Sequence, residues 1–476
     1  MADRTVLAFD QQEYSRARLD ALAAGMAASL ERRGVVPGDR VALMSSNRPE
    51  FVIAVLAIWQ AGAVVVLISP AWKRTEVAHA LEVGEVAHAV GDNSVLTALM
   101  PTLCLDDPIE EGFRPPTPAG PDADAVLVFS SGTTGLPKAV RHTHASFAAA
   151  IEHWRDALKL TAADRIQIVT PPSHILGLLN IATVLDVGAW MRLHRRFDLD
   201  AMLSHIESDR ITVEMAVAPI ALAIASHPDL ESFDLSSLRY IMWGATPVTP
   251  SVAETVTRRT GVPWVPAYGA SEVPVIACSP IDGARLDSVG RAVPGVEMRV
   301  VSLDTGAVLA PCGTGDALAP GNTGELQVRS ASMMAGYLPS TTTADAFDDG
   351  WYRTGDVGSV DTDGWVRITD RSKDMIKVKG FQVAPAEIET VLFSHPDIAD
   401  CAVFGVDDPF TGEAVVAAVT TTAPITADEI IDLVGSTLAS YKRPSRVVFV
   451  PEIPRLPSGK VLRRILEERH GRTSDQ

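Results

Sequence analysis

The sequence predicts an α/β protein: a large amino-terminal domain of parallel-sheet α/β subdomains with a small β subdomain, followed by an α+β carboxyl-terminal domain. Apolar runs of strand length alternate with helical patterns in the first half of the chain, which is typical of parallel sheets covered by helices. After about Asp287 the pattern changes to short β segments separated by turn residues. The apolar runs lie at 41–44, 64–68, 125–129, 165–169, 213–217 and 240–243.

One apolar stretch, at 51–70, is long enough to suggest a membrane-spanning helix. Gln60 and Gly62 divide it into two short halves. We therefore expect a buried helix at 50–60 and a buried strand at 64–68 instead of a span.

The carboxyl-terminal hundred residues form a further unit. A chain of 476 residues exceeds one ordinary core, so at least two domains are expected. We predict an amino-terminal domain at 1–370 and a carboxyl-terminal domain at 371–476. The elements expected in the second domain are helices at 385–393 and 427–438 and strands at 401–406 and 446–450.

Charge and cysteine content exclude several classes of protein. The formal net charge of -18 disfavours a nucleic-acid partner and a polybasic membrane-binding surface. The four cysteines lie far apart without CxxC spacing, so neither a zinc site nor a disulfide framework is predicted. The start MADRTVLAFD lacks the pattern of a secretion signal. We expect a cytoplasmic protein without integral membrane association, and the choice between monomer and homodimer stays open.

A loop of small hydroxyl residues and glycines follows the strand predicted at 125–129 and reads SSGTTGLPK from Ser130 to Lys138. Its glycines allow close backbone approach, its hydroxyls can donate hydrogen bonds, and Lys138 supplies a positive charge, all of which suits phosphate. Leu136 and Pro137 separate the second glycine from the lysine, so this is not a Walker A motif. From composition alone an ordinary turn remains the simpler interpretation.

Further stretches follow in order along the chain, and each one alone is best interpreted as a turn, a solvated loop or a strand edge. Together they resemble the motifs of the adenylate-forming superfamily, which includes acyl- and aryl-CoA ligases, luciferases and the adenylation domains of peptide synthetases. The resemblance is strongest to acyl-CoA synthetases of the 4-coumarate–CoA ligase type. The stretches read WGATP (243–247), YGASE (268–272), YRTGD (352–356), DRSKD (370–374), MIKVKGFQVAP (375–385) and PRLPSGK (454–460).

The resemblance implies an ATP site in the large domain. The loop at 130–138 would hold phosphates, and the departures from the family pattern at Ala139 and Arg141 remove no donor. Glu272 would hold Mg²⁺ next to the phosphates, and Asp356 would accept from both ribose hydroxyls. The implied ATP- and AMP-binding residues are Ser130, Ser131, Gly132, Thr133, Thr134, Gly135, Lys138, Gly244, Ala245, Thr246, Tyr268, Gly269, Ser271, Asp356, Arg371, Lys377, Gln382 and Lys460.

The resemblance also implies a mobile carboxyl-terminal domain with its hinge at Lys373. Lys460 would be the catalytic lysine, acting with Glu272 and Lys138. Lys379 and Gly380 would border the tunnel that admits the pantetheine arm of CoA.

The acyl pocket is implied at His174 and Val273. Ser173 stands where the family usually has an aromatic residue before this histidine, and a core histidine is the alternative interpretation of His174. Amino-acid-activating relatives carry an aspartate in this region, but the segment 170–178 has no acid. An amino-acid substrate is therefore not expected.

The function implied by the resemblance is that of an AMP-forming carboxylic acid–CoA ligase. It would use ATP, Mg²⁺ and coenzyme A, and its partners would be a small-molecule carboxylic acid and CoA. One alternative is a stand-alone adenylating enzyme that loads a separate carrier protein. Another is a non-catalytic nucleotide-binding homologue, which the presence of Lys138, Glu272, Asp356, Arg371 and Lys460 disfavours. The sequence does not select among aryl, alicyclic and fatty acids.

Overall fold

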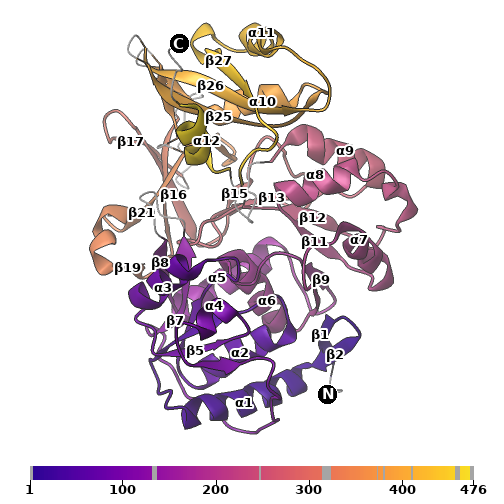
Figure 1. Ribbon diagram of the computed structural model, residues 1–476, viewed down its shortest axis with the longest axis vertical. Coiled ribbons are helices and arrows are strands. Elements are labelled where there is room, and N and C mark those ends of the chain that lie inside the picture. Colours follow the sequence, from indigo (N-terminus) through magenta and orange to yellow (C-terminus); the bar gives the residue numbers. More distant parts are fainter. Residues whose placement is uncertain are drawn as a thin grey trace.

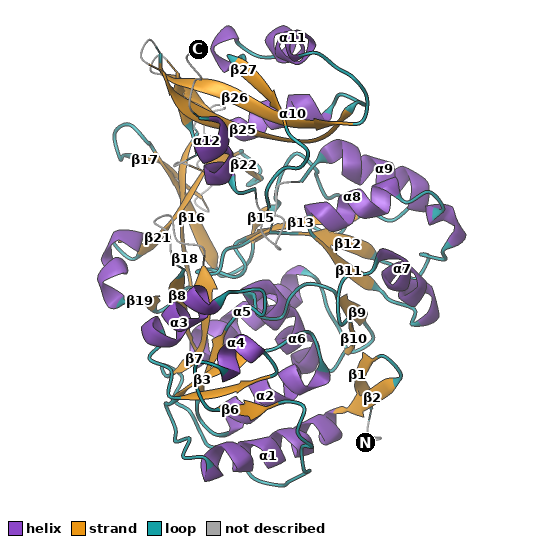
Figure 2. Ribbon diagram, in the orientation of Figure 1, coloured by secondary structure: helices purple, strands orange, loops and turns teal. Residues whose placement is uncertain are grey.

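Four β-sheets organise the part of the chain that the structure describes (Figure 1). The structure is a computed structural model. The carboxyl-terminal unit lies at the end of the molecule opposite α1 (Arg16–Arg32), as Figure 2 shows. The described residues are 4–130, 137–245, 248–312, 323–371, 374–378, 381–408, 411–455 and 461–471.

The first sheet has the strand order β19-β8-β7-β4-β3-β5-β6, in which β7 to β6 pair in parallel and β8 and β19 are antiparallel. Its central strand β4 reads VVVL and is buried along its whole length, as expected where helices cover both faces. The apolar stretch at 51–70 is a helix followed by a strand, as predicted. The elements of this region are β3 (Arg40–Met44), β4 (Val64–Leu67), β5 (His88–Gly91), β6 (Thr102–Cys104), β7 (Asp124–Ser130), β8 (Lys138–Thr143), β19 (Gly336–Leu338), α2 (Pro49–Gln60), α3 (Arg74–Val83) and α4 (Ser94–Thr97).

None of the helices within the described ranges is long and apolar enough to cross a membrane.

The second sheet has the order β15-β14-β13-β12-β11-β9-β10-β1-β2, and its strands from β13 to β1 are parallel. Helices α5 and α6 pack together, and Trp154 of α5 donates a hydrogen bond to Asn180 of α6 at 2.7 Å. The strands predicted at 165–169, 213–217 and 240–243 are confirmed. The elements are β1 (Thr5–Phe9), β2 (Gln12–Ser15), β9 (Arg165–Ile168), β10 (Trp190–Leu193), β11 (Val213–Ala216), β12 (Tyr240–Trp243), β13 (Trp264–Tyr268), β14 (Ala277–Cys278), β15 (Arg291–Ala292), α5 (His144–Ala157), α6 (Ile175–Val187), α7 (Leu199–Ser208), α8 (Ala218–Ser226), α9 (Pro250–Thr260) and the 3-10 turn η1 (Leu230–Ser232).

The small β subdomain predicted after Asp287 is a six-stranded antiparallel sheet of order β17-β16-β18-β21-β20, with β22 paired to β21. Its last strand, β22, leads to the carboxyl-terminal region. The elements are β16 (Val296–Val301), β17 (Val308–Cys312), β18 (Gly324–Ser330), β20 (Phe347–Asp348), β21 (Trp351–Val360), β22 (Val366–Arg371) and the 3-10 turns η2 (Ser340–Thr342) and η3 (Ala344–Ala346).

The carboxyl-terminal region has its own sheet, of order β24-β23-β26-β25 with β27 beside β26, and its own apolar core. Both predicted helices are present there, and the strand predicted at 401–406 extends to eleven residues. The domain boundary at 370/371 stays a prediction. The elements are β23 (Ile376–Val378), β24 (Phe381–Val383), β25 (Ile398–Asp408), β26 (Gly412–Thr421), β27 (Arg446–Phe449), α10 (Pro385–Phe393), α11 (Ala427–Thr437), α12 (Arg463–His470) and the 3-10 turn η4 (Ser440–Lys442).

A buried carboxyl group lies inside the second sheet, away from the motifs. Glu214 on β11 is fully buried, and it accepts hydrogen bonds from the Gln167 side chain at 2.9 Å and from the Met215 backbone at 3.0 Å. Burial raises the pKa of Glu214 to about 8. The carboxyl group therefore holds its proton at neutral pH in the folded protein.

Glu214 makes stability dependent on pH in a direction that can be measured. Between pH 4.5 and about 8 the folded state keeps a proton that the unfolded state has released. The free energy of unfolding therefore falls as pH rises through this window, by up to about 1.4 kcal/mol per pH unit from this group. In urea titrations from pH 5 to 8, Glu214→Gln should gain stability relative to the wild type as pH rises.

The quantity compared is the change of unfolding free energy with pH. The absolute stability is not compared, because the new amide also changes the hydrogen bonding at Gln167. Glu254→Gln, which replaces an exposed acid on α9, serves as the matched control and should follow the wild-type pH profile. Parallel profiles for Glu214→Gln and the wild type would contradict the assignment.

Candidate active site

Two of the predicted motifs follow neighbouring parallel strands. Gly244 and Ala245 come directly after β12, and Tyr268 ends β13 beside it. In open parallel sheets, ligands bind outside the carboxyl ends of the strands. Pairing of β12 with β13 thus places Trp243, Gly244 and Ala245 at the same edge as the YGASE stretch, although the two are more than twenty residues apart in the sequence.

The YGASE loop is closed on itself by backbone contacts. Ala270 N–H donates to the carbonyl of Val273 at 2.9 Å, and Ile276 N–H donates to the carbonyl of Tyr268 at 2.9 Å. Gly269 is required in this loop, because a Cβ atom there would lie 2.1 Å from the Pro274 carbonyl oxygen. The tight turn holds Ser271 and Glu272 at its tip.

Asp356 joins the second sheet to the β subdomain. The Tyr268 hydroxyl donates to Asp356 Oδ2 at 2.5 Å, and Arg371 Nε lies 2.9 Å from Asp356 Oδ1. Asp356 and Arg371 face each other as register partners on β21 and β22. Burial raises the pKa of Tyr268, and the charge of Asp356 raises it further, so the phenol remains a hydrogen-bond donor at neutral pH.

This arrangement leaves Asp356 able to take a further ligand. Each carboxylate oxygen has two lone-pair sites, and among the described residues Tyr268 engages Oδ2 once and Arg371 engages Oδ1 once. A buried carboxylate whose position is fixed by two donors is suited to accept from two neighbouring hydroxyls, as the ribose prediction for Asp356 and Arg371 requires.

Glu272 is the second buried carboxylate of the site, with 8% of its surface exposed. The Tyr337 hydroxyl donates to Glu272 Oε1 at 2.8 Å, and Met334 N–H donates to the Glu272 carbonyl at 2.8 Å. Burial and then the charge of Glu272 raise the pKa of Tyr337. Lys138 at the start of β8 lies over the Tyr337 ring, with Nζ 5.3 Å from the ring centre. Lys138, Glu272 and Tyr337 therefore form one cluster.

The donor set fits Mg²⁺ only if phosphate completes the shell. Among the described residues no group of three or more His, Cys, Asp or Glu side chains could hold a metal ion. Mg²⁺ is commonly bound by one or two carboxylates together with substrate phosphates and water. Glu272, beside a lysine suited to phosphate, matches that mode of binding.

The acyl-pocket predictions fall on one half-buried position, His174, and one fully buried position, Val273. His174 precedes α6 as its N-cap, and burial lowers the pKa of its imidazole, so that it is neutral at neutral pH. Val273 is fully buried in the main core directly behind Glu272. Ser173 is also buried, and its hydroxyl has no hydrogen-bond partner within the described part of the chain. Both assignments stay predictions.

Of the remaining predicted residues, only some lie within the ranges that the structure describes. Ser130 ends β7 as the register partner of Lys138, and Lys377 lies exposed on β23, where its backbone N–H donates to Glu413. Gln382 lies on β24, but its side chain is not described. Ten predicted residues lie outside the described ranges: Ser131, Gly132, Thr133, Thr134, Gly135, Thr246, Lys373, Lys379, Gly380 and Lys460.

Sequence reasoning missed Tyr337, although its hydroxyl holds Glu272. The two residues are 65 positions apart and lie on different elements. Tyr337 is brought to Glu272 because the short strand β19 pairs with β8. No spacing rule marks such a pair, since only the sheet order brings the two residues together.

Comparison with known proteins agrees with this geometry. The family model for the AMP-binding enzyme matches residues 1–338, and the model for the AMP-binding enzyme C-terminal domain matches residues 387–460. The chain therefore belongs to the AMP-binding enzyme family, and the predicted resemblance to adenylate-forming enzymes is confirmed.

Within this family the chain is similar to ligases of acids and CoA. It is 33% identical to 4-coumarate–CoA ligase 2 of Nicotiana tabacum over 494 residues, covering 96% of this chain and 89% of the relative. ATP-bound MatB from Rhodopseudomonas palustris has a TM-score of 0.92 at 27% identity, covering 98% of this chain and 96% of that one. O-succinylbenzoate coenzyme A synthetase (MenE) from Bacillus subtilis, in complex with ATP and magnesium ion, has a TM-score of 0.87 at 28% identity, covering 98% and 97%.

The role of Asp356 predicts how the protein discriminates between nucleotides. The wild type should bind AMP at least about tenfold more tightly than 2′,3′-dideoxy-AMP, because a charged hydrogen-bond acceptor would lose both hydroxyl partners. In Asp356→Asn this difference should shrink to about threefold or less. Isothermal titration of both nucleotides measures it.

Asp287→Asn is the matched control, since Asp287 is an exposed acid paired with Arg285 outside the cluster. It should keep the wild-type discrimination. An undiminished preference for AMP in Asp356→Asn would remove Asp356 from the ribose site.

Proposed function

We propose that this protein is an AMP-forming carboxylic acid–CoA ligase. The observation that carries the proposal is the cluster of Glu272, Tyr337 and Lys138 beside the Asp356–Arg371 pair, in a chain that belongs to the AMP-binding enzyme family. Support for CoA as the acceptor comes from relatives named as CoA ligases and synthetases that match nearly the whole chain.

The proposed reaction has two steps at one site. In the first, a carboxylate oxygen of the acid attacks the α-phosphorus of ATP, and the bond to pyrophosphate breaks. In the second, the thiolate of CoA attacks the acyl carbon, and AMP leaves with the oxygen that had bridged carbon and phosphorus. The first step is needed because a carboxylate itself is a poor electrophile toward a thiol.

The chain's own residues would act mainly by positioning and by electrostatics. Glu272 would hold Mg²⁺, which offsets negative charge on the phosphates when bound. Lys138 and the loop at 130–138 would bind the departing pyrophosphate, with Lys138 held over Tyr337. Asp356 and Arg371 would fix the ribose. Tyr268 would keep Asp356 in place through its hydroxyl.

The carboxyl-terminal domain would supply Lys460 to the first step, where it bridges the carboxylate and the α-phosphate. This domain would then move about Lys373 so that the thiol can enter beside Lys379 and Gly380. The residues assigned here to the second step belong to the same domain, which is why one movement would serve both.

Substrate, acceptor and location complete the proposal. The acid is a small-molecule carboxylic acid other than an amino acid, because the segment 170–178 carries no carboxylate to hold an ammonium group. CoA is the acceptor, in preference to a carrier protein. The protein acts in the cytoplasm, where Cys278 and Cys401 remain buried free thiols.

Product analysis tests the proposal directly. The protein is incubated with ATP, Mg²⁺ and a panel of aryl, alicyclic and fatty acids, with and without CoA, and acyl-AMP and acyl-CoA are measured by mass spectrometry. We expect a thioester only when CoA is present. Lys460→Ala should lose acyl-AMP formation at least about a hundredfold while its affinity for ATP changes little, because it removes a transition-state contact.

Each other outcome has a definite meaning. If acyl-AMP accumulates and does not react with CoA, the proposed acceptor would be a carrier protein instead of CoA. Absence of both products across the panel would overturn the assignment to these acid classes. Unchanged acyl-AMP formation in Lys460→Ala would remove Lys460 from catalysis.

A further inference from the structure

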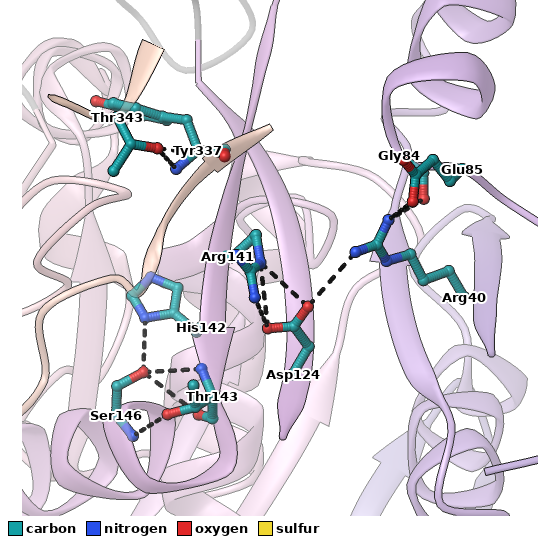
Figure 3. A network of polar contacts seen from close by, with 10 residues as sticks. All are labelled: Arg40, Gly84, Glu85, Asp124, Arg141, His142, Thr143, Ser146, Tyr337 and Thr343. Carbon is teal, nitrogen blue, oxygen red and sulfur yellow. Dashed lines mark hydrogen bonds and ion pairs between the residues drawn. The ribbon is translucent and has the colours of Figure 1, made fainter. Parts of the chain in front are cut away.

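His142 lies between the strand that carries Lys138 and the loop that carries Glu272. It stands near the end of β8, and its side chain is fully buried. Its Nε2 is 2.7 Å from the carbonyl oxygen of Ser271. Its Nδ1 is 3.3 Å from Ser146 Oγ, near the start of α5 (Figure 3).

The partners of His142 define which ring nitrogen carries the hydrogen. A carbonyl oxygen only accepts, so Nε2 must donate to Ser271. Nδ1 is then an acceptor, and the Ser146 hydroxyl points its hydrogen toward Nδ1 or toward the Thr143 carbonyl, each at 3.3 Å. Burial lowers the pKa of His142 to about 4, so the imidazole is neutral at neutral pH.

The hydrogen bond from His142 acts on the peptide bond that enters Glu272. The carbonyl of Ser271 and the N–H of Glu272 belong to one planar peptide unit, so holding the carbonyl sets the plane of that unit. On the other side of Glu272, Met334 N–H holds its carbonyl and the Tyr337 hydroxyl holds its carboxylate. Glu272 is thus fixed on both sides.

The contacts on both sides of Glu272 depend on the same strand, β8. β19, which brings Tyr337, pairs with β8 at Val140, and Ala335 N–H donates to the Arg141 carbonyl at 2.8 Å. His142 belongs to β8 itself, four residues after Lys138. The distance between Lys138 and the carboxylate of Glu272 is therefore set through β8.

A role in packing alone does not account for a histidine here. Val140, two residues earlier on the same face of β8, is fully buried and apolar. An apolar side chain at position 142 would fill the space without the cost of burying two ring nitrogens. Within the described part of the chain, that cost is offset by the contacts of the ring nitrogens with Ser271 and Ser146.

We propose that His142 is a positioning residue, which anchors the Ser271–Glu272 peptide to β8 and so sets where the Glu272 carboxylate meets metal-bound triphosphate. The proposal rests on the proposed function. His142 itself touches neither the metal nor the substrate, and it acts through the backbone of the loop.

Binding measurements with and without metal separate this role from simple stability. The quantity measured is the affinity for ATP in excess Mg²⁺ divided by the affinity for ATP in EDTA, both by isothermal titration. His142→Asn is too short to reach Ser271 and should lower this ratio about tenfold, whereas His142→Gln can place an amide N–H near the former Nε2 position and should stay within about threefold of the wild type. Affinity for ATP in EDTA should change by less than about twofold in both.

Val140→Ala is the matched control, because it removes buried methyl groups from the same strand and keeps the histidine that bonds to Ser271. It should lower the melting temperature and leave the metal ratio unchanged. Equal ratios in His142→Asn and His142→Gln, or a lowered ratio in Val140→Ala, would overturn the role of His142. A wild type whose ATP affinity does not depend on Mg²⁺ would overturn the metal-dependent proposed function and this inference together.

Discussion

The site is governed by the need of two buried carboxylates, Glu272 and Asp356, for hydrogen-bond donors. A carboxylate taken out of water is costly unless such donors face it. Each carboxylate has a donor from an element distant in sequence, Tyr268 for Asp356 and Tyr337 for Glu272, and Arg371 on the adjacent strand also serves Asp356. The edges of three sheets must therefore meet at one place, and this meeting defines the site.

The carboxyl-terminal region contacts the strand β22 next to the site residue Arg371. Asp370 directly precedes Arg371, and its carboxylate accepts from the Ala386 backbone N–H at 2.9 Å, at the start of α10. Burial raises the pKa of Asp370 to about 6. A movement of this domain would thus act on Asp370, which is next to Arg371, the partner of Asp356. Such a connection is suited to an enzyme that uses one site for two successive steps.

Most of the fold followed from the sequence, because strands buried on both faces read as apolar runs, as VVVL does in β4. The motif residues could also be predicted from the sequence, since glycines, acids and lysines stand out at a loop, and their roles stay predictions. Tyr337 and His142 could not be predicted, because their partners are set by sheet order and not by spacing. In the segment AVRHTH (139–144) the sequence marks Arg141 as a departure from the family pattern, yet Arg141 pairs with Asp124 at 3.0 Å (Figure 3). His142, on the opposite face of β8, contacts the Ser271 carbonyl of the site loop.

The most direct test of the account follows oxygen atoms through the reaction. An acid that the protein accepts is labelled with ¹⁸O in both carboxylate positions, converted with ATP, Mg²⁺ and CoA, and the products are analysed by mass spectrometry. Transfer through an acyl-AMP predicts one ¹⁸O in AMP and one in the thioester carbonyl. AMP free of ¹⁸O would show that the carboxylate oxygen never bonded to the α-phosphorus, and would contradict adenylation at this site.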